Sequence, residues 1–459
     1  MSDSDRALRA AAAYAEDFIA RLPERRVGTD ASADELRAVL GGPLPEEPQP
    51  GADVIDSLIK GTEPGVVATA GPRFFGFVIG AALPTTVAAD WLTSVWDQNA
   101  GLFAAGPSAS VVEEVAGSWL KELLNIPAHA SFSLVTGCQM AHFVGLASAR
   151  HHVLAEAGWD VERDGLQGAP PITVVAGAER HVTIDRALRY LGLGTAVVSA
   201  VDADDQGRME MGSFRDVLAR AEGPTIVCAQ AGNVNTGSFD PLTEICDAAH
   251  EQGAWVHVDG AFGAWAAVAP SLRPLLAGAE RADSWATDAH KWLNVPYDSG
   301  LAFCAHPNSH RAAMSVHASY LVQSEDGGER DQMDWTPEFS RRARGFTTYA
   351  AIRSLGRRGI TEMIERSCAN ARRFADALAA EPGVEIVNDV VLNQVLVSFG
   401  DDERTKAVIE RVQADGTCWL GGTVWHGRAL MRISVSSWST TAEDVDVSVE
   451  AILRCAREV

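Results

Sequence analysis

Six residues that could take part in catalysis or ligand binding stand at or just beyond the ends of apolar runs. In chain order they are Gly137, Cys138, His181, Asp259, His290 and Lys291. Asp259 is the last residue of the run AWVHVD, and Lys291 is the second residue after the run SWATDA. In an open parallel sheet, ligands bind beyond the carboxyl ends of the strands. We therefore expect the six residues to meet around a ligand at one edge of a sheet.

The residue types fit a phosphorylated pyridine aldehyde. A lysine such as Lys291 can form an imine with the aldehyde, and a carboxylate such as Asp259 can keep the ring nitrogen protonated, which makes the ring an electron sink. A histidine such as His181 can stack on the ring. Small residues before a helix, as in TGCQ at 136–139, leave backbone N–H groups free to bind phosphate. Together these features predict a site for pyridoxal 5′-phosphate (PLP).

Each of these features also has a structural interpretation. A strand-end aspartate such as Asp259 is more often structural, and a lone lysine is usually a solvated surface charge. His181 taken alone would be interpreted as a helix cap or a surface histidine, and TGCQ as a common strand–helix turn. The order and spacing of the whole set, rather than any single member, favour the cofactor site.

The elements that position these residues follow an α/β pattern. From about residue 110, apolar runs alternate with helical segments, and the clearest runs are ITVVA (172–176), TAVVSA (195–200), TIVCA (225–229), AWVHVD (254–259) and LAFCA (301–305). Runs that are continuous rather than alternating are typical of strands buried on both faces, so the pattern predicts a mostly parallel sheet. Helices are expected over 5–22 and 361–380. The smaller segment 384–459 is predicted to form a separate α+β domain.

The motifs together resemble the PLP-dependent group II amino-acid decarboxylases, the family of aromatic-amino-acid, glutamate and histidine decarboxylases. HVDGAFG (257–263) looks like the family's H-V-D-A-A motif, and DAHKWLNVP (288–296) looks like its H-K-W motif. Further matching segments are PRFFGFVIG (72–80), TGCQMAHF (136–143), AERHVTIDRALRYLG (178–192), AGNVNTGSFDPL (231–242) and RISVSSWSTTAEDVD (432–446). The likeness runs from about residue 72 to the C-terminus.

The resemblance implies a fold, a reaction and an assembly. The fold is the type I PLP-dependent transferase (aspartate aminotransferase-like) α/β fold, with a mostly parallel, seven-stranded-type sheet and a smaller C-terminal α+β domain. The implied domains are an N-terminal helical dimerisation segment over 1–68, a large PLP-binding domain over 69–345 and a small domain over 346–459. The implied reaction is PLP-dependent decarboxylation of an L-amino acid to the amine and CO₂. The implied assembly is a homodimer in which the N-terminal segment wraps the partner.

The family's roles carry over residue by residue. Lys291 would form the covalent link to PLP, Asp259 would pair with the pyridine nitrogen, and His181 would stack on the ring and help to position the substrate carboxylate. These three are the predicted catalytic residues. The further predicted cofactor contacts are Gly137, Cys138 and His290 for the phosphate and Ala261 for the other face of the ring.

One departure from the family bears on the reaction. Many family decarboxylases carry a tyrosine on the loop after the position of Tyr320, where it is thought to protonate the carbon that CO₂ leaves. The matching position here falls near Gln332, and no tyrosine lies between 321 and 348. An aldehyde-forming oxidative deaminase or a carbon–carbon lyase on the same scaffold is therefore an alternative to decarboxylation. A catalytically silent relative is a third alternative, which the retained Lys291 disfavours.

The substrate side chain is only weakly constrained by the sequence. The residues that match the family's side-chain pocket are Phe77, Ile79, Leu102 and Phe103, with Trp96 nearby. An apolar lining favours an aromatic or other hydrophobic side chain over glutamate, because a buried carboxylate needs a partner. The same residues fit the apolar core of a dimer equally well, and nothing in the sequence names the substrate.

Composition narrows the possible partners and the compartment. The 459 residues carry a net charge of −23, which disfavours binding to nucleic acid or to an anionic membrane. The seven cysteines are scattered without metal-type spacing, so no metal site is predicted, and the pattern is typical of reduced thiols. The charged, amphipathic N-terminus is not a signal peptide, and no run of about 18 apolar residues exists. A cytoplasmic enzyme is expected.

Overall fold

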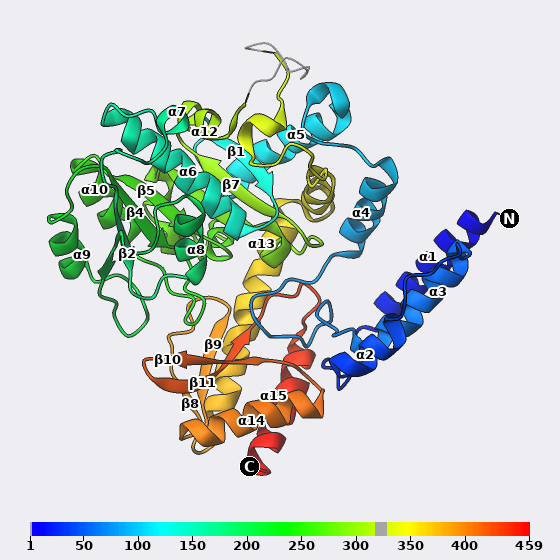
Figure 1. Cartoon of the computed structure of the whole chain (residues 1–459). Coiled ribbons are helices and arrows are strands. Elements are labelled where there is room, and N and C mark those ends of the chain that lie inside the picture. Colours follow the sequence, from blue (N-terminus) through cyan, green and yellow to red (C-terminus); the bar gives the residue numbers. More distant parts are fainter. Residues whose placement is uncertain (1, 317–327) are drawn as a thin grey trace. The chain divides into compact units, whose positions relative to one another are not determined.

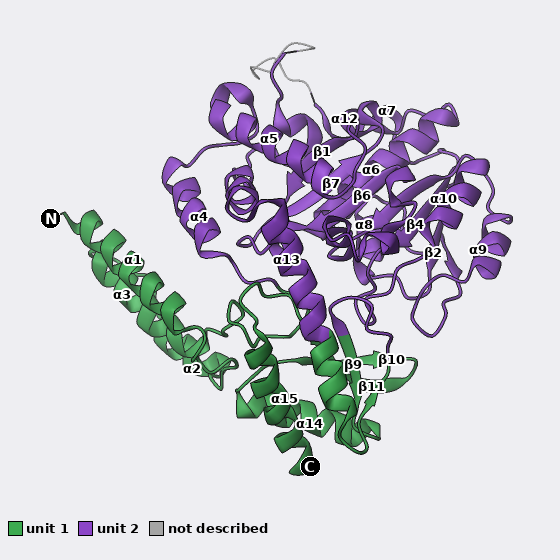
Figure 2. Ribbon diagram, turned by 180° about the vertical axis from the view of Figure 1, so that it is seen from behind, with its two compact units in different colours: residues 1–79, 372–387, 395–459 green, residues 80–371, 388–394 purple. Residues whose placement is uncertain are grey.

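The computed structural model describes residues 2–316 and 328–459 (Figure 1). The chain divides into two compact units (Figure 2). The smaller unit comprises residues 1–79, 372–387 and 395–459, and the larger unit comprises residues 80–371 and 388–394. The partition by role into 1–68, 69–345 and 346–459 stays a prediction.

The larger unit is built on a seven-stranded sheet. In spatial order its strands are β1 (Ser131–Val135), β7 (Gly300–Cys304), β6 (Ser284–Asp288), β5 (Trp255–Asp259), β4 (Thr225–Gln230), β2 (Thr173–Gly177) and β3 (Val198–Val201). Strand β7 runs antiparallel to β1 and β6, and every other neighbouring pair is parallel. Strands β1, β4, β5, β6 and β7 are buried along their whole length. The mostly parallel, doubly covered sheet expected from the continuous apolar runs is therefore confirmed.

Helices surround this sheet. They are α4 (Pro84–Trp96), α5 (Pro107–Leu123), α6 (Cys138–Glu156), α7 (Val161–Asp164), α8 (Val182–Tyr190), α9 (Met211–Leu218), α10 (Leu242–Glu251), α11 (Ala289–Trp292) and α12 (Pro307–Met314). Helix α6 crosses the sheet and contacts five strands, including β5 and β6 (Figure 1). Its residue Gly145 permits this close approach, because a Cβ there would lie 2.7 Å from the His257 ring on β5. Helix α6 therefore sits directly against the strands that carry the predicted site.

The smaller unit holds a four-stranded sheet and the C-terminal helices. The strand order is β10 (Gly421–Trp425), β11 (Arg428–Ser434), β9 (Gln394–Ser398) and β8 (Glu385–Ile386), and helices α14 (Asp402–Asp415) and α15 (Ala442–Arg457) pack together beside it. Helix α15 begins after Thr441, which forms a reciprocal cap with Asp444. Helix α13 (Gly345–Ala379) begins in the larger unit and ends in the smaller one, with a non-helical backbone at Gly356.

The N-terminal part of the smaller unit is helical and contributes almost no fully buried residues. Helices α1 (Asp3–Arg21) and α3 (Gly51–Thr62) pack against each other, and α2 (Ala33–Leu40) packs on α3. Across these three helices only Gly61 is buried. In residues 2–316 and 328–459, no helix has both the length and the hydrophobicity that crossing a membrane requires.

Candidate functional site

The C-terminal ends of four strands bring the predicted residues to one edge of the large sheet. These residues are Gly137 and Cys138 after β1, His181 after β2, Asp259 at the end of β5, and His290 and Lys291 after β6. Short contacts link the segments: the Cys138 N–H donates to Asp288 Oδ1 at 2.6 Å, and the Ala261 N–H donates to Asp259 Oδ1 at 3.1 Å. The sequence predicted this convergence from the strand ends alone.

Lys291 is held by a carboxylate that the sequence argument missed. Its Nζ lies 2.9 Å from Asp288 Oδ2, and Asp288 is almost fully buried. Burial disfavours the charged amine, but the attraction of Asp288 outweighs it, so the pKa of Lys291 is raised above its usual value. A signal was present in the sequence, because Asp288 is the last residue of β6 and stands three positions before the lysine.

Asp259 is placed to remain an anion. Burial raises its pKa, but the neighbouring His142 outweighs this effect together with His181 and Lys291, so the pKa of Asp259 falls below its usual range. Among the described residues, the hydrogen bonds and the ion pair of the Asp259 side chain all involve Oδ1. The second oxygen, Oδ2, is therefore available to a ligand.

His142 and His257 form a buried pair behind Asp259 that the sequence argument did not find. His142 Nε2 lies 3.5 Å from Asp259 Oδ1, and His142 Nδ1 lies 2.9 Å from His257 Nε2. Burial, with a contribution from His142, lowers the pKa of His257 to about 3, so this ring is neutral. Cys138 Sγ, His142 Nε2 and Asp259 Oδ1 also lie within 4.8 Å of one another, a spacing that a metal ion could use.

The segments around Gly137 fit tightly together. A Cβ at Gly300 would lie 2.4 Å from the Gly137 Cα, so only glycine allows the end of β1 to approach β7 here. His290 Nδ1 accepts a hydrogen bond from the Ser299 N–H at 3.1 Å, which leaves the proton of the neutral ring on Nε2, 3.4 Å from Asp288 Oδ1. Cys138 begins the 19-residue helix α6. Backbone and imidazole N–H groups therefore point toward the position that Asp288 Oδ1 occupies.

His181 is the N-cap residue of α8. Its Nδ1 lies 2.8 Å from Thr183 Oγ1, which orients the ring, and the ring is close enough for its charge to lower the pKa of Asp259. The capping interpretation of His181 is therefore confirmed for this chain, and its ring-stacking role stays a prediction.

The four predicted substrate-pocket residues are divided between the units. Phe77 and Ile79 belong to the smaller unit, and Leu102 and Phe103 belong to the larger one. Phe77 is exposed and stacks on Trp419 with ring centroids 5.5 Å apart. Neither unit assembles the whole set by itself, and the substrate pocket stays a prediction.

Position 332 does not lie on an exposed loop. Gln332 is 1% exposed, and its side-chain amide donates to the Ser110 backbone oxygen at 3.2 Å and accepts from Arg330 Nε at 2.7 Å. Gln332, near which the family's loop tyrosine was expected, fills a buried polar niche against α5, and the part that this position plays in the reaction stays a prediction. The start of that loop, including Tyr320, lies outside the described residues.

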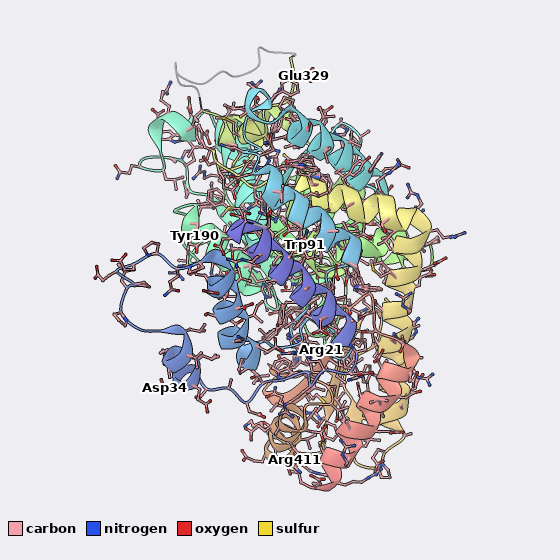
Figure 3. All side chains as sticks on the ribbon, turned by 90° about the vertical axis from the view of Figure 1, so that its right-hand side faces the viewer. Arg21, Asp34, Trp91, Tyr190, Glu329 and Arg411 are labelled. Atoms are coloured by element: carbon pink, nitrogen blue, oxygen red, sulfur yellow. The ribbon has the colours of Figure 1, made fainter. Side chains whose placement is uncertain are left out.

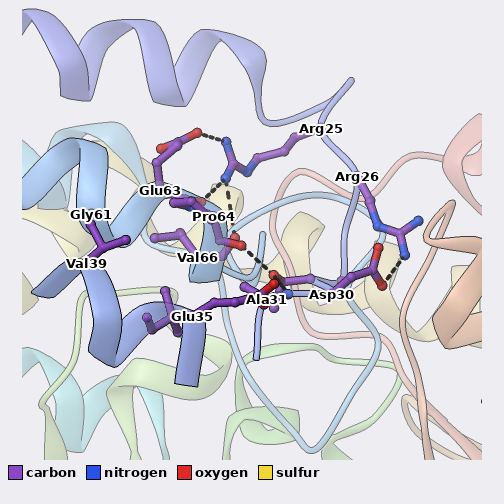
Figure 4. Close-up of a pocket in the computed structure, with 13 residues that line it drawn as sticks. Arg25, Arg26, Asp30, Ala31, Glu35, Val39, Gly61, Glu63, Pro64 and Val66 are labelled. Carbon is purple, nitrogen blue, oxygen red and sulfur yellow. Dashed lines mark hydrogen bonds and ion pairs between the residues drawn. The ribbon is translucent and has the colours of Figure 1, made fainter. Parts of the chain in front are cut away.

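A cavity of about 700 Å³ in the smaller unit lies apart from this chemistry (Figure 4). It is lined by residues before and within α2, at the end of α3 and just after α3, and four of its five charged side chains form two ion pairs. Arg25 pairs with Glu63 at 2.5 Å, and Arg26 pairs with Asp30 at 3.0 Å. Because these charges are already neutralised, the cavity does not compete with the strand-end site.

Comparisons with known proteins point to one family. The sequence model described as "Pyridoxal-dependent decarboxylase conserved domain" matches residues 34–400. Tryptophan decarboxylase 1 of Oryza sativa subsp. japonica is 28% identical over 461 residues, covering 93% of this chain and 87% of that protein. The aromatic-L-amino-acid decarboxylase of Sus scrofa is 27% identical over 465 residues, covering 97% and 94%. The crystal structure of Oryza sativa TDC with PLP and tryptamine superposes with a TM-score of 0.92 at 24% identity, covering 99% of this chain and 98% of that one, and supports the fold.

Proposed function

This chain belongs to the pyridoxal-dependent decarboxylase family, and from that premise we propose that it decarboxylates an aromatic L-amino acid. It is a PLP-dependent carboxy-lyase that acts on amino acids. The observation that carries the proposal is the placement of Lys291 and Asp259 at the ends of neighbouring strands β6 and β5. The two relatives described above are named for tryptophan and for aromatic L-amino acids, and the predicted pocket residues are apolar.

The geometry of the strand-end site fits PLP. Asp259 is an anion whose Oδ2 is available for a protonated ring nitrogen, and the buried Lys291 amine lies at the end of the adjacent strand. N–H groups of Cys138 and His290 converge on one position, where a phosphate oxygen could replace the Asp288 carboxylate oxygen. Gly137 keeps this position open, because a Cβ there would press against the His290 ring at 3.2 Å.

Each residue then has a proposed role. When bound, PLP supplies an electron sink for the electron pair that stays on the α-carbon as CO₂ departs. Lys291 holds the cofactor covalently, and Asp259 keeps the proton on the ring nitrogen. Gly137, Cys138 and His290 hold the phosphate, and Ala261 packs on one face of the ring. His181 covers the other face and orients the substrate carboxylate.

The final proton is assigned to His181. The carbon that loses CO₂ must receive a proton, and a positioned acid contributes roughly 10²–10⁴-fold to such a step. Gln332 cannot supply it, because its amide is not acidic near neutral pH and its side chain is enclosed. His181 follows β2 and lies at the same sheet edge as Lys291, and an imidazole can donate a proton near neutral pH. We therefore assign the step to His181 or to a water that it binds.

A substrate panel tests the function directly. Purified enzyme is incubated with tryptophan, tyrosine, phenylalanine and glutamate, and CO₂, amine, aldehyde and peroxide are measured together. The proposal expects equal amounts of CO₂ and amine from an aromatic substrate and little turnover of glutamate. Turnover of glutamate alone, or aldehyde and peroxide without amine, would contradict it. The Lys291→Ala variant serves as the control for turnover that does not depend on the cofactor link.

The homodimer is also part of the proposal. Helix α4 exposes four large apolar side chains on one face, at i, i+1, i+4 and i+5: Trp91, Leu92, Val95 and Trp96 (Figure 3). Helices α1–α3 contain one fully buried residue, Gly61, and leave the side chains of Leu8, Val39, Leu40, Val54 and Leu58 exposed in this chain. Exposed apolar surface of this kind marks an interface, and a second copy of the chain is the partner that the family resemblance implies.

A cytoplasmic location is proposed on the state of the cysteines. All seven cysteines are free thiols, and all seven are buried. Protein thiols persist in this form in a reducing compartment. This argument is independent of the catalytic site.

A further inference from the structure

A line of buried hydrogen-bonding groups runs from Trp255 to Asp259. The Trp255 indole N–H donates to Ser284 Oγ at 2.9 Å, and Ser284 Oγ lies 2.8 Å from His257 Nδ1. His257 Nε2 lies 2.9 Å from His142 Nδ1, and His142 Nε2 lies 3.5 Å from Asp259 Oδ1. His142, His257 and Ser284 are 0% exposed. The line therefore joins helix α6 to strands β5 and β6 inside the protein, behind the carboxylate.

The protons along this line can be placed by counting donors. His257 is neutral and carries one N–H. If that proton is on Nε2, it is donated to His142 Nδ1, and the proton of a neutral His142 must be on Nε2. If the His257 proton is on Nδ1, then His142 must donate from its own Nδ1 to His257 Nε2. In that arrangement His142 Nε2 faces the Asp259 carboxylate, either with a proton or with only a lone pair. A lone pair against a carboxylate is repulsive, so both arrangements favour a proton on His142 Nε2, directed at Asp259 Oδ1.

The close packing of α6 behind Asp259 depends on Gly145, a residue outside the motifs that resemble the family. Gly145, one turn of α6 beyond His142, is needed because a Cβ there would lie 2.7 Å from His257 Cε1. Burial of two imidazoles and a hydroxyl costs desolvation free energy, whereas well-packed apolar side chains at the same positions would not have this cost. The fold alone therefore gives no reason for this arrangement.

We propose that His142, oriented by His257 and Ser284, is a positioning residue that holds Asp259 as an anion with Oδ2 directed at the cofactor ring. The inference rests on the proposed role of Asp259 as the partner of the ring nitrogen. His142 acts through that carboxylate and does not touch the reacting atoms. The neighbouring thiol of Cys138, 3.4 Å from His142 Nε2, offers a weaker acceptor for the same proton.

The test compares PLP with 1-deaza-PLP, in which a C–H group replaces the ring nitrogen. Apoprotein of the wild type, His142→Ala and His142→Gln is titrated with each compound, and the dissociation constants and absorbance spectra are measured. We expect His142→Ala to weaken PLP binding by about tenfold or more, the scale of a hydrogen bond to a charged group, and to change deaza-PLP binding less than about twofold. His142→Gln keeps an N–H donor, so it should recover part of the loss and serves as the second variant if His142→Ala does not fold.

Two further variants separate this inference from the proposed function. His310→Gln changes another fully buried histidine of the same unit, which bonds to Ser131 and the Trp335 backbone oxygen. This variant should change the dissociation constants of PLP and 1-deaza-PLP by the same factor. Asp259→Asn should discriminate as His142→Ala does, and the double variant should add little to either single loss.

Each outcome has a distinct meaning. If Asp259→Asn weakens both compounds equally, Asp259 is not the ring partner and the proposed site fails. If Asp259→Asn discriminates but His142→Ala weakens both equally or neither, only the role of His142 is overturned. Stoichiometric zinc in the purified protein, lost in Cys138→Ala, would also overturn it, because a metal needs the Nε2 lone pair that the proposal assigns to a proton.

Discussion

Asp288 holds the two groups that PLP needs for its aldehyde and its phosphate. One carboxylate oxygen lies 2.9 Å from the Lys291 amine, and the other accepts the Cys138 N–H at the start of α6. An amine must be neutral to attack an aldehyde, and Asp288 favours the charged form by raising the pKa of Lys291. Asp288 should therefore slow the uptake of the cofactor while it orients the lysine.

The Asp288→Asn variant tests this balance. Asparagine can still accept the Cys138 N–H but does not stabilise a lysine cation, so the pKa of Lys291 should fall and PLP should attach faster. A change of one pKa unit corresponds to about a tenfold change in the neutral fraction. The rate is measured by stopped-flow absorbance after apoprotein is mixed with PLP, and the control is Asp90→Asn, at a partly buried carboxylate of the same unit that pairs with Arg342. Uptake at the wild-type rate or slower would show that Asp288 does not restrain the lysine.

At the scale of elements, the segment 330–335 packs against strand β1 and forms hydrogen bonds with the segment before α5. The Arg330 guanidinium lies 4.3 Å from the ring centroids of both Phe132 and Trp335. Asp331 Oδ1 accepts the Phe103 N–H at 2.7 Å. Burial lowers the pKa of Arg330 to about 10, so it stays charged at neutral pH. This packing holds Gln332 inside the protein.

The Gln332→Tyr variant should destabilise the protein without changing the products. A larger ring in a filled polar niche costs about 1–3 kcal/mol, and it also removes the bonds to Ser110. We expect a lower urea midpoint and an unchanged ratio of amine to aldehyde. Glu329→Tyr, at an exposed position three residues earlier (Figure 3), should change the free energy of unfolding by less than about 0.5 kcal/mol. A stable Gln332→Tyr enzyme with a raised amine ratio would restore the loop interpretation.

A second element-scale prediction concerns pH and the start of strand β6. Asp283 contacts His306 Nε2 at 2.7 Å and His250 Nε2 at 3.1 Å. Burial raises the pKa of Asp283, but its hydrogen bonds to the two histidines outweigh this and lower the pKa to about 2, whereas the pKa of His250 is raised by Asp283. The carboxylate's contribution is present above about pH 4 and is lost as pH falls toward about 2. The contribution of His250 is full below its unfolded pKa of about 6.5 and is lost as pH rises through its folded value.

The Asp283→Asn substitution should therefore lower the free energy of unfolding most between about pH 4 and pH 6.5. The lowered pKa of the carboxyl corresponds to about 2 kcal/mol of stability. The cost, measured by urea unfolding across pH, should decrease on both sides of that window. The control Asp247→Asn breaks an exposed pair with Arg281 and should cost much less stability, with little dependence on pH, because solvent screens exposed pairs. A cost of Asp283→Asn that does not vary with pH would contradict the assignment.

At the scale of the whole molecule, the exposed face of α4 predicts the assembly. Trp91, Leu92, Val95 and Trp96 are all more than 40% exposed in one copy, and burial of such side chains contributes about 1.5–3 kcal/mol each. A second copy of the chain that covers this face would remove its apolar surface from water. The exposed apolar residues of α1 and α3, including Leu8, Val54 and Leu58, add a second surface of the same kind.

Light scattering should find twice the chain mass of 48.8 kDa for the wild type. Val95→Glu places a charge on the α4 face and should shift the protein toward monomer and lower its turnover. Val424→Glu makes the same change at an exposed valine of the smaller unit and is expected to leave the mass unchanged. An active wild-type monomer would refute the homodimer.

Much of this protein followed from local sequence patterns. Continuous apolar runs predicted the buried strands, and the strand ends predicted that Asp259 and Lys291 share one edge, because parallel strands place their carboxyl ends together. These inferences need only the chain direction and the period of the pattern. The roles of the two residues came from motif resemblance and are still to be tested.

Other features were decided only by tertiary packing. His142 meets Asp259 because α6 crosses β5 closely at Gly145, and no spacing along the chain encodes that distance. Gln332 is enclosed because Ser110, more than 200 positions earlier, supplies its hydrogen bonds. Local patterns specify elements and the directions of their ends, whereas a contact between distant side chains depends on how helices pack on the sheet. The contact of His142 with Asp259 and the burial of position 332 are therefore features that only the folded chain shows.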